Sequence, residues 1–76
     1  MEESAMEVYR RETREVVRRF LDNQLTFESC IYSLDAALAR FIPRMEPEQL
    51  RDLRIEMLAN NEVVMNEMAR RGREEN

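Results

Sequence analysis

The longest weakly charged stretch of the chain runs from Thr26 to Ile42. It holds only three charged residues, although charged residues make up 37% of the whole sequence. Its large apolar residues recur at steps of three and four: Phe27, Ile31, Leu34, Leu38 and Phe41. Smaller apolar residues lie on the remaining faces, and a helix that is apolar nearly all round is typical of a buried helix. We therefore expect this segment to be the centre of a small helical fold.

An amphipathic helix is predicted before this segment, over residues 4–22. Ser4 followed by Glu7 is a capping-box pattern, in which the serine side chain accepts a hydrogen bond from the third helical N–H. After this cap, apolar residues keep steps of three and four while charged residues occupy the other faces. This pattern predicts a surface helix with one buried side.

Two further signals divide the rest of the chain into helices. Thr26 offers an N-cap oxygen, so the second helix is predicted over residues 27–42. Pro43 disfavours a helical conformation at the preceding residue and ends that helix. Pro47 fits the first position of a third helix and is followed by an acidic first turn. We predict this third helix over residues 47–71, because Gly72 and a polar tail follow.

The helix lengths and short connections predict the fold class. Connections of about three to five residues usually join antiparallel neighbours in a helical bundle. We therefore expect an all-α, up-down-up three-helix bundle in a single domain over residues 1–76. The third helix would be about 36 Å long, against about 24 Å for the second. Its last third should then project past the second helix and expose apolar residues: Val63, Val64, Met65 and Met68.

Two asparagines, Asn60 and Asn61, lie in the middle of the third predicted helix, where asparagine is unfavourable. Asn60 shares an apolar seam with Leu53, Met57 and Val64. Three interpretations are open. A polar residue in an apolar seam can fix register and partner number. Asn60 can instead lie at the edge of the seam and bond water, or the helix breaks and Asn61 caps a short fourth helix.

The size of the chain limits how its core can be completed. A domain of 76 residues buries only about 60% of the surface of its unfolded chain, so it is marginally stable without further support. One cysteine and no histidine exclude an intrachain disulfide and the commonest metal ligand. We therefore predict a homodimer, with another protein as a second possible partner. The interface is expected on the third helix: Met57, Asn60, Val64, Met65 and Met68.

The charge balance argues against general nucleic-acid binding. Sixteen acidic and twelve basic residues give a net charge of −4, and phosphate contacts need an excess of basic residues. All basic residues are arginine, and Arg11, Arg14 and Arg18 line one face of the first helix. They are weak candidates for anion binding, because the interspersed glutamates favour a solvated, paired face. A nucleic-acid-associated regulator that uses these arginines is the alternative function.

No residue pattern predicts catalysis, a cofactor or a metal. Cys30 lies near the start of the second helix in a loose CxxS pattern, where the helix dipole can lower a thiol pKa. Redox sites of this kind need a strand-to-helix context, however, and free cysteine is usually buried. Without histidine or a calcium-loop pattern, no metal site is expected. The leading prediction is a small, non-enzymatic protein–protein interaction module.

The sequence also predicts where the protein is found. No apolar segment approaches the ~20 residues needed to span a bilayer. The N-terminus, Met1-Glu2-Glu3-Ser4, is acidic, whereas a signal peptide begins with basic and then apolar residues. We expect a soluble, cytoplasmic protein that does not bind membranes, and one free cysteine fits a reducing compartment.

Overall fold

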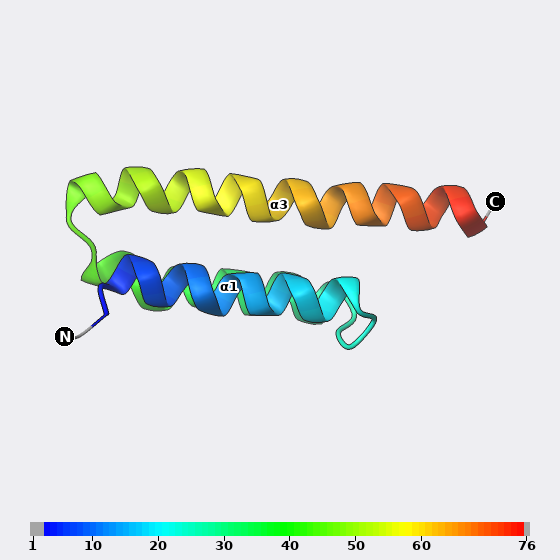
Figure 1. Cartoon of the computed structure of the whole chain (residues 1–76), viewed down its shortest axis with the longest axis horizontal. Helices are drawn as coiled ribbons and strands as arrows, with labels where there is room; N and C mark the ends of the chain where they lie inside the picture. The colour runs from blue at the N-terminus through cyan, green and yellow to red at the C-terminus, as the bar shows by residue number, and fades with distance from the viewer. Residues whose placement is uncertain (1–2, 76) are drawn as a thin grey trace.

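The computed structural model describes residues 3–75, which form an all-helical bundle (Figure 1). The elements are three α-helices and a 3₁₀ turn: α1 (Ala5–Leu21), α2 (Phe27–Phe41), η1 (Ile42–Arg44) and α3 (Pro47–Glu75). The chain runs up along α1, down along α2 behind it, and up again along α3. This confirms the predicted three-helix fold class.

The starts of α1 and α2 follow the predicted caps. The Ser4 Oγ accepts a hydrogen bond from the backbone N–H of Glu7 at 3.2 Å. The Thr26 Oγ1 accepts one from the backbone N–H of Ser29 at 3.1 Å. Each cap satisfies a backbone N–H that has no partner within its own helix. Local side-chain chemistry therefore sets both boundaries, and α3 begins at Pro47 as predicted.

The core consists of two hydrophobic clusters, one in each half of the bundle. The first cluster is built from all three helices: Met6, Tyr9, Ala37, Phe41 and Leu53. The second cluster is as well: Val17, Phe20, Cys30, Leu34 and Val64. Two buried polar residues, Thr13 on α1 and Asn60 on α3, lie between cluster members along their helices. The Thr13 hydroxyl donates to the Tyr9 carbonyl at 2.8 Å, so it is satisfied within its own helix.

The prediction that the second helix is buried nearly all round is wrong. α2 buries only one face, and Tyr32 on the other side is 76% exposed. α1 packs closely against both α2 and α3, whereas α2 and α3 approach each other less closely. Small side chains line the α1–α2 contact, and larger ones such as Leu38 and Met57 line the crevice between α2 and α3. α1 is therefore the helix shared by both close contacts.

α3 is one continuous helix of 29 residues through Asn60 and Asn61, so the interpretation that the helix breaks here is wrong. At 1.5 Å per residue it is about 43 Å long, close to the 47 Å length of the molecule. Asn60 is only 7% exposed, which also excludes an edge position open to water. Its burial in the seam leaves the register interpretation, which stays a prediction. Within residues 3–75, no helix has the length and hydropathy to cross a bilayer.

The helix also continues past Gly72, where the sequence predicted its end. A Cβ atom at Gly72 would meet nothing within 4 Å, so packing does not require glycine there. Arg70 pairs with Glu67 in the preceding turn and with Glu74 in the following turn. Such pairs stabilise exposed helix and offset the low helix propensity of glycine. The last turns therefore remain helical.

The projecting end of α3 is less apolar than predicted. In Figure 1 its orange-to-red end extends beyond the loop that joins α1 and α2. Val64, however, is fully buried in the second cluster, and Met68 packs against the same cluster. Leu25 and Phe27 beside that loop also pack there and lengthen the core beyond the end of α1. The prediction that Val64 projects into solvent is therefore wrong.

Candidate interaction surfaces

The side of α3 that faces away from α1 and α2 carries an exposed stripe. Its members follow steps of four, three, four and three, which places them along one face of a helix. We call this face the outer stripe: Arg51, Ile55, Leu58, Glu62 and Met65. Ile55 is 62% exposed and Leu58 is 52% exposed. Figure 1 shows α3 as a layer of its own, with α1 and α2 on one side of it only.

The two charged residues of the outer stripe have no ionic partner in the described part of the chain. Neither Arg51 nor Glu62 forms an ion pair within residues 3–75. By contrast, Glu67 pairs with both Arg70 and Arg71 near the end of α3. The outer stripe therefore presents two large aliphatic side chains between an arginine and a glutamate that remain available to a partner.

The structure separates the five residues predicted for the interface. Asn60 and Val64 are buried inside the chain's own core. Met57 and Met68 are half-buried, and Met65 is exposed on the outer stripe. Burial removes Asn60 and Val64 from any surface that the folded chain presents. Contact with a partner stays a prediction for the three methionines.

The sequence pattern did not single out Ile55 and Leu58. The longer inner seam of Leu53, Met57 and Val64 dominates the helical periodicity of this segment. A second, shorter apolar pair on the opposite face is overlooked when a surface helix is assumed to have one apolar face. The i,i+3 spacing of Ile55 and Leu58 is the signal that would have found the pair, because the buried face of the same helix is already formed by other residues.

The arginine face of α1 is paired with carboxylates. The Arg14 Nε lies 2.8 Å from Glu56 Oε1, so this arginine links α1 to α3. Hydrogen bonds from Arg18 hold the pKa of Glu15 below its usual value. Each candidate arginine has an acidic partner: Arg11 has Glu3, Arg14 has Glu56, and Arg18 has Glu15 and Asp22. Because these pairs largely cancel the local field, no contact here favours phosphate, and anion binding stays a prediction.

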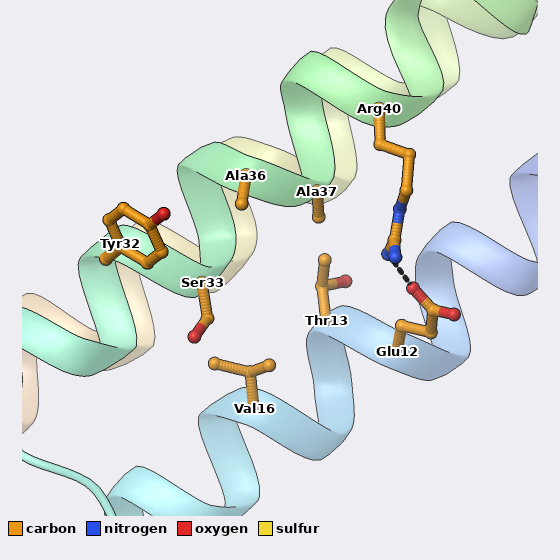
Figure 2. A pocket seen from close by; sticks show the side chains of 8 residues that line it. All are labelled: Glu12, Thr13, Val16, Tyr32, Ser33, Ala36, Ala37 and Arg40. Carbon is orange, nitrogen blue, oxygen red and sulfur yellow. Dashed lines mark hydrogen bonds and ion pairs between the residues drawn. The ribbon is translucent and has the colours of Figure 1, made fainter.

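A shallow groove of about 310 Å³ separates α1 from α2 (Figure 2). Its lining comes from both helices: Glu12, Thr13, Val16, Tyr32, Ser33, Ala36, Ala37 and Arg40. Figure 2 shows Arg40 of α2 reaching across one end to pair with Glu12 of α1. The Thr13 hydroxyl is engaged by its own helix, and no acid–base pair faces a nucleophile. The groove therefore reflects the small residues that let α1 and α2 approach.

Cys30 is buried in the second cluster with no exposed surface, which confirms the prediction of a structural cysteine. Burial raises the pKa of its thiol, which is opposite to the shift that activates a nucleophilic cysteine. Among residues 3–75, no three cysteine or carboxylate side chains converge into a group that could hold a metal ion.

No protein-family model, no curated protein and no solved structure matches this chain. Among the surfaces described above, the outer stripe combines exposed large apolar side chains with charges that lack partners within residues 3–75.

Proposed function

We propose that this chain is a small helical interaction module that self-associates through α3. The observation that carries the proposal is the exposed pair Ile55 and Leu58 on the side of α3 that neither α1 nor α2 covers. Exposed large apolar side chains that share one face favour a protein–protein contact. A helix that presents such anchors at i,i+3 spacing is a common way to dock on another helical surface.

The small core supports a second copy as the partner. Within the described residues, only ten apolar side chains are buried, and a core of this size gives limited stability. A partner that binds only the folded state stabilises it by mass action. Another copy of the chain is the simplest partner because it is present wherever the protein is made. The proposal includes a cytoplasmic location, where a lone reduced cysteine is usual.

Sedimentation equilibrium from low to high micromolar concentration tests the proposal. The wild-type chain should sediment as a dimer, and Leu58→Glu should shift it to a monomer that keeps its helical circular dichroism. Glutamate is a good helix former, and Leu58 is half exposed within the chain, so the substitution leaves the folded monomer intact. A folded wild-type monomer at high micromolar concentration contradicts the proposal.

Tyr32→Glu is the matched control. Tyr32 is the most exposed large apolar residue of α2, and it lies on a different face from the outer stripe. The same introduced charge should leave the dimer unchanged. Dissociation by Tyr32→Glu but not by Leu58→Glu would place the contact on α2 and contradict the proposed surface.

A further inference from the structure

We infer that two copies of this chain pair through their outer stripes in antiparallel orientation, about a two-fold axis that passes between Ile55 and Leu58. The inference rests on the proposed self-association and specifies its geometry. A two-fold contact brings the same surface of both copies together, so that surface must be complementary to itself. The order of charged and apolar residues along the stripe meets this requirement.

The first four residues of the outer stripe are symmetric in spacing and opposite in charge at their two ends, Arg51 and Glu62. Arg51 precedes Ile55 by four residues, and Glu62 follows Leu58 by four residues. Reversing one helix about the midpoint therefore places Arg51 opposite the partner's Glu62. The same operation places Ile55 opposite the partner's Leu58. Each dimer then contains a central apolar contact between two ion pairs that are equivalent by symmetry.

A parallel arrangement does not use this pattern. In register, it would place Arg51 opposite the partner's Arg51 and Glu62 opposite the partner's Glu62. Like charges directly opposed across an interface disfavour that pairing. Because both residues are exposed and lack ion-pair partners within residues 3–75, antiparallel pairing satisfies them without breaking an existing contact.

The residues beside the stripe are compatible with this arrangement. The same reversal brings Arg54 on one flank level with the partner's Ala59, and Asp52 on the other flank level with the partner's Asn61. No like charges are opposed on either flank. α1 and α2 lie on the other side of α3 (Figure 1), so the two bundles remain on opposite sides of the contact.

Charge reversal tests the pairing. Arg51→Glu alone opposes glutamates at both symmetric sites, and Glu62→Arg alone opposes arginines. At low salt each variant should therefore dimerise with a Kd about tenfold higher or more. An equimolar mixture of the two variants should form a heterodimer of near wild-type affinity, because each Glu–Arg contact is restored. The double variant Arg51→Glu/Glu62→Arg should recover the homodimer for the same reason.

Sedimentation equilibrium measures the wild type and these four samples, and Arg19→Glu on α1 is the control with the same change in net charge as Arg51→Glu. A wild-type monomer would overturn both the proposed function and this inference. A wild-type dimer that neither single reversal weakens would overturn the antiparallel pairing and leave the proposed function standing. Loss of dimer in each single variant without recovery in the mixture and the double variant would likewise overturn the pairing.

Discussion

The guanidinium of Arg71 on α3 lies over the ring of Phe20 on α1, 4.4 Å from the ring centroid. The same guanidinium donates a hydrogen bond through Nη2 to the Phe20 carbonyl at 2.9 Å. Its Nε lies 2.8 Å from Glu67 Oε2, which orients it. A cation that bonds a carbonyl in the last turn of a helix is also favourable for the helix dipole. One side chain thus joins the end of α1 to the last turns of α3.

Arg71→Lys should destabilise the bundle by about 1–2 kcal/mol, because lysine keeps the charge but loses the planar stacking and the fork of donors. Urea unfolding followed by circular dichroism measures the change. Arg73→Lys is the control, since Arg73 is exposed two residues further along α3, and it should leave the free energy of unfolding nearly unchanged. Equal stability of the Arg71→Lys protein and the wild type would contradict the proposal that Arg71 joins the end of α1 to α3.

The lowered pKa of Glu67 should make the free energy of unfolding decrease in acid. Hydrogen bonds from Arg70 and Arg71 lower the pKa of Glu67 from 4.5 to about 2 in the folded chain. At pH values between these two, the unfolded chain binds more protons, so acid favours unfolding. The contribution is therefore complete above about pH 4.5 and is lost as pH falls toward 2. Glu67→Gln should flatten this part of a plot of unfolding free energy against pH, whereas Glu28→Gln at the start of α2 should not. If Glu67→Gln leaves the slope of unfolding free energy against pH unchanged, the lowered pKa of Glu67 is contradicted.

Asn60→Leu should stabilise the protein by about 1 kcal/mol. The Asn60 Nδ2 is buried and has no hydrogen-bond partner within residues 3–75, and an unsatisfied buried donor is costly. Leucine has the same branching and number of side-chain heavy atoms as asparagine, and it suits an apolar seam. Asn61→Leu is the neighbouring control, because Asn61 is exposed and its replacement should change stability by less than about 0.5 kcal/mol. Thermal unfolding compares the two, and a lower midpoint for Asn60→Leu would show that the amide has a favourable role.

Cys30 should react with a chromogenic thiol reagent only when the second cluster opens. Its side chain has no exposed surface, and burial raises its thiol pKa, so both access and thiolate fraction are low. Labelling should be slow in the native protein and rapid in denaturant, as measured by absorbance over time. Rapid native labelling would contradict the burial of this residue.

The parts of the fold that local chemistry determines were predictable from the sequence. Ser4 and Thr26 act through hydrogen bonds within three residues, and Pro43 and Pro47 act through fixed backbone angles. Such effects need no knowledge of distant parts of the chain. The starts of the helices and the up-down-up order followed from them.

The parts that depend on how helices approach each other were not predictable. The exposure of Tyr32 depends on α1 packing closely against one face of α2. The burial of Val64 depends on where Leu25 in the α1–α2 loop and Phe27 at the start of α2 come to lie. Neither relation is encoded in the periodicity of a single helix. The outer stripe was missed for the same reason, because Ile55 and Leu58 become distinctive only once Leu53 and Val64 are known to be buried on the other side.

The continuity of α3 through Asn60 determines whether the two clusters unfold separately or together. Leu53 belongs to the first cluster and Val64 to the second, and both are carried by the same uninterrupted helix. If the helix broke at Asn60, either end of the molecule could open while the other stayed intact. A single rigid element that runs through both clusters instead transmits the loss of one to the other. The bundle should therefore unfold as one cooperative unit, although Thr13 and Asn60 are buried between the two clusters.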